Sequence, residues 1–138
     1  MADDPKNKNW AKRLAGVALC SLPLLLAVAC AVFARPVSPA TSWLGLILAA
    51  AACLVGALNF NLRFVRPLLH KRQHGSLEGY RFVSGLPVVG TLLQVSGCVA
   101  AFGSPMVGFL GIVSCLIDAD GLSWFPIVTW KDGSLWDA

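Results

Sequence analysis

Charge is scarce in this chain, and its scarcity excludes an ordinary soluble domain. Only 13% of the 138 residues are Asp, Glu, Lys or Arg, whereas 57% are hydrophobic and the mean hydropathy is +0.70. Soluble domains carry roughly 25% charged residues. The charge that would cover a water-exposed surface is missing, so composition indicates a single membrane domain over residues 1–138. The net charge of +4 is a mild excess, and we expect contact with membrane lipid rather than with nucleic acid.

Metal-binding and disulfide patterns are also lacking. The five cysteines form no CxxC pair and their number is odd, so neither a zinc site nor a disulfide framework is expected. The only histidines, His70 and His74, have a spacing that places both on one helical face, but too few further ligands accompany them. We interpret them as part of a solvated basic loop and predict no metal and no cofactor.

A short acidic motif resembles the start of a calcium-binding loop without completing it. Asp118-Ala119-Asp120-Gly121 has the first ligands, but Pro126 and Thr129 occupy the ninth and twelfth positions. Two loop histidines and two aspartates at a membrane edge do not supply a nucleophile, a base and an orienting partner. The sequence therefore predicts a protein that is not an enzyme.

Long uncharged runs are what the sequence does contain. They cover residues 14–34, 36–62 and 82–117, which are 21, 27 and 36 residues. Each exceeds the roughly 18 residues that a spanning helix needs. A helix satisfies its backbone hydrogen bonds within one segment, as lipid demands, so we predict an all-α fold.

The third run must turn back, because as one helix it would be about 54 Å long against a hydrocarbon core of roughly 30 Å. Gly103-Ser104-Pro105 predicts the turn. We therefore expect a polytopic protein with four transmembrane helices. Their predicted ranges are 14–34, 42–60, 82–102 and 106–118, with a loop at 61–81. The fourth is short, because extending it would draw Asp118 and Asp120 into the bilayer.

The C-terminal tail, from Gly121 to Trp136, carries Trp124, Trp130 and Trp136. Tryptophan favours the membrane interface because its ring is apolar while its N–H seeks a polar partner. We expect an interfacial tail.

Basic residues predict the orientation. The loop 35–41 has Arg35 alone, and the 103–105 turn has none. The other ten basic residues lie in the N-terminal segment, the loop 61–81 and the tail: Lys6, Lys8, Lys12, Arg13, Arg63, Arg66, Lys71, Arg72, Arg81 and Lys131. The positive-inside rule places both termini and the 61–81 loop in the cytoplasm. The first run exceeds the usual roughly 7–15-residue core of a cleaved signal, so we expect it to be retained.

Few polar residues lie within the predicted helices, and the first three hold no titratable Asp, Glu, Lys, Arg or His. This disfavours a proton-coupled transporter. Gln94 is the one strong hydrogen-bonding side chain at depth, typical of contact between helices. Small residues recur at four-residue spacing, as at Gly97 and Ala101, and let helices approach closely. Packing within the chain and a homo-oligomer would use the same pattern, so both stay open.

Two segments resemble a known group of proteins. Tyr80-Arg81-Phe82-Val83-Ser84-Gly85-Leu86-Pro87-Val88-Val89-Gly90 and Leu116-Ile117-Asp118-Ala119-Asp120-Gly121-Leu122-Ser123-Trp124-Phe125 resemble parts of small bacterial inner-membrane proteins encoded beside polymorphic or type VI secretion toxins. The resemblance covers roughly residues 78–126. It implies an immunity protein, which protects the producing cell by binding a cognate toxin, and it carries no catalytic motif.

The leading hypothesis is therefore a non-enzymatic inner-membrane protein that neutralises a membrane-directed toxin. An accessory subunit of a larger membrane complex is the alternative, and a small channel or transporter is a third. The candidate partner contacts are Gly97, Ala101, Gln94, Asp118, Asp120 and Trp124. For the two aspartates, capping of a helix end is the competing interpretation.

Overall fold

A computed structural model describes residues 9–132 and 136, and every regular element in these residues is helical. The elements in chain order are α1 (Trp10–Val32), α2 (Pro39–Phe60), the π-helical turn η2 (Asn61–Val65), α3 (Arg66–His74), α4 (Val89–Ala100), α5 (Pro105–Ile117) and α6 (Phe125–Thr129). The all-α prediction is confirmed for this part of the chain. Lys6, Lys8 and residues 133–135 lie outside the described residues.

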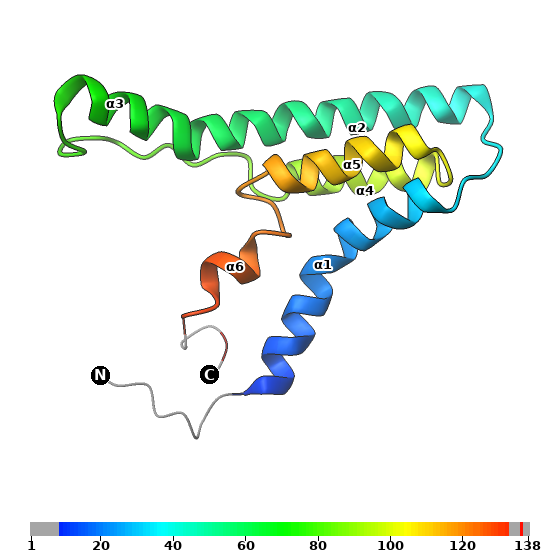
Figure 1. Cartoon of the computed structure of the whole chain (residues 1–138), viewed down its shortest axis with the longest axis horizontal. Coiled ribbons are helices and arrows are strands. Elements are labelled where there is room, and N and C mark those ends of the chain that lie inside the picture. Colours follow the sequence, from blue (N-terminus) through cyan, green and yellow to red (C-terminus); the bar gives the residue numbers. More distant parts are fainter. Residues whose placement is uncertain (1–8, 133–135, 137–138) are drawn as a thin grey trace.

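One long rod organises the molecule (Figure 1). The helices α2, η2 and α3 run on without interruption, and α4 and α5 pack beside the α2 part of the rod. The C-terminal half of α1 lies against this group, mainly against α5, while its N-terminal half diverges toward α6. The α1–α2 connection and the α4–α5 turn therefore lie together at the end of the bundle opposite α3.

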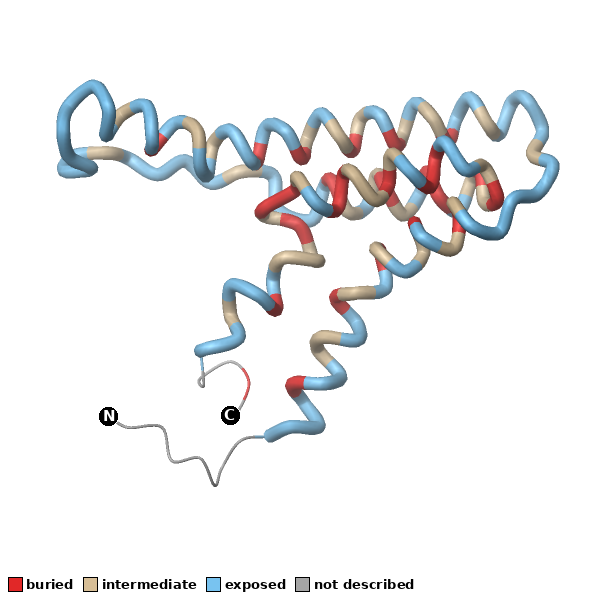
Figure 2. The backbone as a smooth tube through the Cα atoms, in the orientation of Figure 1, coloured by how far each residue is buried: buried red, intermediate tan, exposed pale blue. Residues whose placement is uncertain are grey.

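The bundle is packed with small residues inside and large apolar residues outside. Buried positions are red in Figure 2 and follow the inner faces of α2, α4 and α5. The fully buried core side chains include Ala27, Cys30, Ala49, Cys98 and Ala101. Large apolar side chains are exposed along the same helices, including Leu19, Leu25, Ile47, Leu54, Leu92, Val99 and Phe109. Close backbone approach with leucine facing outward is typical of helices that pack in lipid.

Among the described residues, two helices are long and apolar enough to cross a membrane: α1, with 23 residues, and the continuous α2–α3 helix, with 36. Only 22% and 28% of their most apolar windows are buried inside the molecule. The apolar helices α4 and α5 have 12 and 13 residues, which is about 18–20 Å at helical rise. Membrane association is supported in this coarse form, whereas four spanning helices are not confirmed.

The turn between the third and fourth predicted helices lies where the sequence places it. Gly103 has a φ of 95°, a conformation that favours glycine, and a Cβ there would lie 2.8 Å from that of Arg35. Pro105 begins α5, where its missing N–H costs no helical hydrogen bond. The predicted end near Asp118 is also confirmed, because α5 ends at Ile117.

The predicted loop 61–81 is wrong over its first two thirds, because the chain stays helical to His74. Pro67 would clash with the carbonyl four residues earlier in a regular helix. The π-helical turn η2 just before it widens the spiral, and the Arg66 N–H bonds to the carbonyl of Asn61, five residues back. The helix ends at Gly75, whose φ of 76° provides a left-handed cap. We call residues 61–81 the basic arm.

The third predicted helix begins seven residues late, at Val89 instead of residue 82. Pro87 disfavours a helical conformation at the residue before it. Val88 has a φ of 69°, which is costly for a β-branched residue. Residues 81–86 have no regular secondary structure and run back beside η2 toward the bundle.

The tail folds back onto α1. Arg13 is only 4% exposed; its guanidinium donates to the Trp130 carbonyl at 2.9 Å and lies 5.3 Å from the Trp130 ring centroid. Gly16 lets the ring of Trp136 approach α1, because a Cβ there would collide with it. The predicted tail thus contains the short helix α6 and docks on the start of α1.

Candidate functional site

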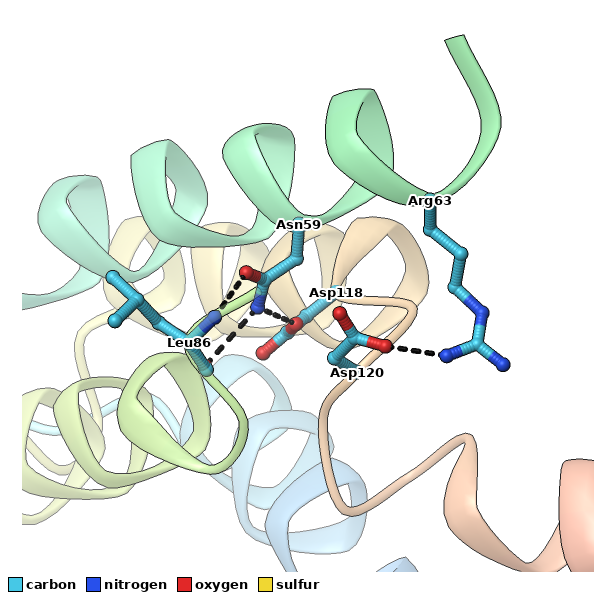
Figure 3. Close-up of polar contacts among 5 residues, drawn as sticks. All are labelled: Asn59, Arg63, Leu86, Asp118 and Asp120. Atoms are coloured by element: carbon cyan, nitrogen blue, oxygen red, sulfur yellow. Dashed lines mark hydrogen bonds and ion pairs between the residues drawn. The ribbon is translucent and has the colours of Figure 1, made fainter. Parts of the chain in front are cut away.

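A buried amide at the end of α2 joins three parts of the fold (Figure 3). Asn59 is 0% exposed. Its Nδ2 donates to Asp118 Oδ1 at 2.7 Å and to the Leu86 carbonyl at 3.2 Å. Its Oδ1 accepts from the Leu86 N–H at 2.8 Å. The side chain therefore fastens α2 to the segment before α4 and to the end of α5.

An ion pair lies about one turn further along the rod. The Arg63 guanidinium contacts Asp120 Oδ1 at 2.6 Å (Figure 3). The Arg63 side chain is 42% exposed and that of Asp120 is 16% exposed, so this pair lies at the surface while the Asn59–Asp118 bond lies inside. A pocket of about 540 Å³ opens beside the pair, between η2 and residues 82–84. We call Asn59, Arg63, Asp118 and Asp120 the polar cluster.

Glycines allow the chain to close around the polar cluster. A Cβ at Gly85 would collide with Asn59 Oδ1 and Asp120 Oδ2, and a Cβ at Gly90 would collide with Asp118 Oδ2. Both glycines lie in the segment predicted to belong wholly to the third helix. Their lack of a side chain brings that segment within hydrogen-bonding reach of Asn59.

The structure brings Asp118 and Asp120 together, but in different roles. Asp118 is the cap residue directly after the end of α5, and it is 2% exposed. A side chain so buried has no surface to offer another protein. The prediction that Asp118 contacts a partner is therefore corrected. Asp120 keeps part of its surface and contacts Arg63. The two aspartates therefore connect the chain to itself.

The predicted small-residue face is already occupied. Ala101 is 0% exposed, and a Cβ on Gly97 would lie 3.1 Å from the Gly45 carbonyl and 3.3 Å from the Ala49 amide. The close approach of α4 to α2 accounts for both residues. A partner could contact this face only by displacing α2, so Gly97 and Ala101 are corrected to intramolecular packing positions.

Gln94 and Trp124 also hold the chain together. Gln94 is 0% exposed, and its Nε2 donates to the Pro23 carbonyl of α1 at 2.9 Å. This places it as the contact between helices that the sequence predicts. The indole N–H of Trp124 donates to the Leu116 carbonyl at 3.2 Å, so the ring fastens the tail to the last turn of α5.

The basic arm extends beyond the bundle (Figure 1). Arg66, Lys71 and Arg72 are exposed, as are Leu68 and Leu69 beside them. The stacked rings of His70 and His74, 4.2 Å apart, lie on this helix, with Tyr80 of the returning segment 5.0 Å from His70. Within residues 9–132 and 136, no three His, Cys, Asp or Glu side chains gather as a metal site.

Asn59 and Arg63 are site residues that are not predicted from the sequence. Gly45, Ala49, Ala52 and Gly56 are the other buried positions of α2, at alternating four- and three-residue spacing. Asn59 continues this series, and Arg63 follows four residues later. A polar residue that continues a small-residue stripe is therefore the signal that would have identified Asn59.

Comparison of the chain with protein-family models, with curated proteins and with solved structures finds no match.

Proposed function

We propose that this chain is a non-enzymatic protein of the bacterial inner membrane that acts by binding another protein. The outward apolar surface of α1, α2, α4 and α5 supports placement of all four helices in lipid, with small residues between them. The short helices α4 and α5 pack against longer ones and share their apolar layer. In this proposal the membrane part is a scaffold.

In the proposed orientation the basic arm faces the cytoplasm. Arg35 is the one basic residue at the end of the bundle that holds the α1–α2 connection and the α4–α5 turn. The start of α1, the arm and the tail point away from that end and carry the remaining described basic residues. Such asymmetry favours cytoplasmic placement of the arm and both termini.

A topology reporter tests this orientation. Alkaline phosphatase, which is active only in the periplasm, is inserted after Ser38 or after His74, or fused at Ala138. We expect activity from the first site alone. Activity at His74 would contradict the proposed orientation.

The observation that carries the binding proposal is the exposure of the basic arm. From Asn61 to His74, η2 and α3 together span 14 residues, which is about 21 Å of helix beyond α2. The main packing partner of α3 is η2 itself. Exposed cations beside exposed leucines, with little packing to explain them, are suited to an acidic partner surface with apolar contacts.

The most specific form of this proposal is immunity to a membrane-directed toxin, which the sequence resemblance supports. In it the scaffold holds the protein where the toxin inserts, and the basic arm contacts the toxin. Blocking pore assembly would follow from that contact. The face of Gly97 and Ala101 plays no direct part, because α2 covers it.

A survival assay tests the immunity function. The product of the neighbouring gene, which the immunity proposal expects to be the toxin, is co-expressed with the wild-type chain or with the double variant Lys71→Gln, Arg72→Gln. We expect survival with the wild type and death with the variant. The control Leu92→Val alters an exposed apolar position on α4 and should preserve survival.

Membrane levels of each variant are measured by immunoblot, so that lost expression is not mistaken for lost binding. Survival with the arm variant at normal abundance would remove the arm from the binding surface. No protection by the wild type would remove the immunity function and leave the accessory-subunit alternative.

A further inference from the structure

A narrow polar cavity lies between α4 and the end of α5, beside Asp118 of the polar cluster. It is too narrow to admit a water-sized sphere. Oxygen-bearing side chains from both helices and from the following loop line it: Thr91, Gln94, Ser114, Asp118 and Ser123. Carboxylate, amide and hydroxyl oxygens are ligands suited to hard cations.

One oxygen of the buried Asp118 carboxylate has no hydrogen-bond partner. Oδ1 accepts from Asn59, but Oδ2 has none although it is fully buried. The nearby Arg63 contacts Asp120 instead. A buried carboxylate is costly unless it is paired, fully hydrogen-bonded or bound to a metal ion. Asp118 therefore has room for one more favourable contact, with a donor or a cation.

A second buried acceptor lines the same cavity. Gln94 Oε1 also has no partner. Exchanging the oxygen and nitrogen of this amide does not remove the problem, because Nε2 must remain where it donates to the Pro23 carbonyl. Two unpartnered acceptors in one cavity call for a species that satisfies both.

Two helix ends lie beside the cavity, and their partial charges have opposite signs. The C-terminal end of α5 lies at Asp118, and such an end carries roughly half a negative charge. The first turn of α4 also approaches the carboxylate at Gly90. That turn has no side-chain cap and offers the Asp118 carboxylate favourable polarity, but none of its N–H groups satisfies Oδ2.

We propose that this cavity binds one Na⁺ ion, with Asp118 Oδ2 and Gln94 Oε1 as ligands and the hydroxyls of Thr91, Ser114 and Ser123 around them. A single carboxylate among neutral oxygens matches a single positive charge. Ca²⁺ takes six to eight oxygen ligands, usually from several carboxylates, and Mg²⁺ retains several waters. The cavity is too narrow for a water-sized sphere, which favours Na⁺ over the larger K⁺. The bound ion would join α4 to α5.

Thermal unfolding in different salts tests the proposal on the intact protein. The full chain in detergent micelles is melted in NaCl, KCl or choline chloride at equal ionic strength and pH. We expect Tm to rise with NaCl in a saturable manner, by about 9 °C at 100 times Kd, and to be equal in KCl and choline chloride. Equal Tm in all three salts would overturn the proposal, because it would show that no cation occupies the cavity selectively.

Binding of radioactive ²²Na⁺ measures occupancy directly. We expect one ion for each chain, displaced by unlabelled Na⁺ but not by K⁺. Asp118→Asn should abolish both the binding and the NaCl-dependent rise in Tm. The matched control Asp120→Asn removes the neighbouring carboxylate, which lies outside the cavity, and should preserve both.

Thr91→Val provides a second variant in case Asp118→Asn does not fold. It replaces the hydroxyl by a methyl group of similar size, and we expect at least a tenfold weaker Na⁺ affinity. Unchanged ²²Na⁺ binding in both Asp118→Asn and Thr91→Val would overturn the assignment of this cavity. The salt comparison with the wild type needs no variant and remains decisive.

Discussion

The bundle and the basic arm differ in which side chains they bury, although one continuous helix runs through both. In the bundle, Gly45, Ala49, Ala52 and Gly56 of α2 are buried against other helices. Along the arm, large and charged side chains are exposed, and Pro67 is the one buried residue of α3. The α2 sequence is therefore explained by packing within the chain, whereas most arm side chains are not.

The polar cluster marks the boundary between these regions. Asn59 is fully buried, and Arg63, four residues later, is 42% exposed on its side chain. Substitutions on the bundle side should lower stability because they disturb close contacts or unpair buried groups. Substitutions on the arm side should leave stability nearly unchanged. Measured free energies of unfolding in detergent therefore test the comparison.

The largest effect is expected for Gly108→Val. A Cβ at Gly108 would collide with the backbone of Ala31 in α1, and backbone atoms cannot rotate away as a side chain does. We expect the free energy of unfolding to fall by more than about 3 kcal/mol, beyond the usual overpacking costs. Reversible unfolding in SDS measures it. The neighbouring control Phe109→Leu is on an exposed position and should cost far less.

The second effect is expected for Asn59→Leu, which removes the partner of the Asp118 carboxylate and of both Leu86 backbone groups. Leaving such buried groups unsatisfied costs roughly 1–3 kcal/mol, more when one is charged, so we expect a loss of about 3 kcal/mol in the same assay. Asn61→Leu is the matched control, because Asn61 is exposed. Equal losses for the two variants would show that the buried network contributes little.

The main features of the fold could be predicted from charge and hydropathy. The uncharged runs located α1, α2 and the α4–α5 pair, and Gly103-Ser104-Pro105 located the turn. The arm could not be predicted this way. Charged residues exclude a segment from the bilayer, but they do not prevent it from being helical. At Pro67 the continuation of the helix depends on the π-helical turn before it, which hydropathy does not encode.

For the site, the sequence indicates some of the polar residues but not the residues that they contact. Asp118, Asp120 and Gln94 stood out because polar side chains near lipid are costly. Their partners depend on tertiary contacts: Asn59 is 59 residues from Asp118 in sequence, and Pro23 is 71 residues from Gln94. Gly97 and Ala101 show the same limit, because a spacing of four predicts close packing without naming the helix that packs.

A smaller effect is expected at the boundary itself. The Arg63–Asp120 pair is partly exposed, and such pairs contribute roughly 0.2–1 kcal/mol. A double-mutant cycle with Arg63→Ala and Asp120→Ala should give a coupling of about 0.5 kcal/mol. It should shrink at 1 M salt, where screening shortens to roughly 3 Å. A coupling several times larger that persists in high salt would place this pair with the buried bundle instead.

The smallest effect on stability is expected in the basic arm, for the double variant Lys71→Gln, Arg72→Gln. Both side chains are exposed, and surface substitutions usually change stability by less than about 0.5 kcal/mol. Arg63, Arg66 and Arg81 remain, so the charge that orients the arm is largely kept. Unchanged SDS unfolding together with loss of protection in the survival assay would separate the two regions by role. If unfolding instead becomes easier by as much as in Asn59→Leu, the arm contributes to the fold, and its exposed cations no longer identify a binding surface.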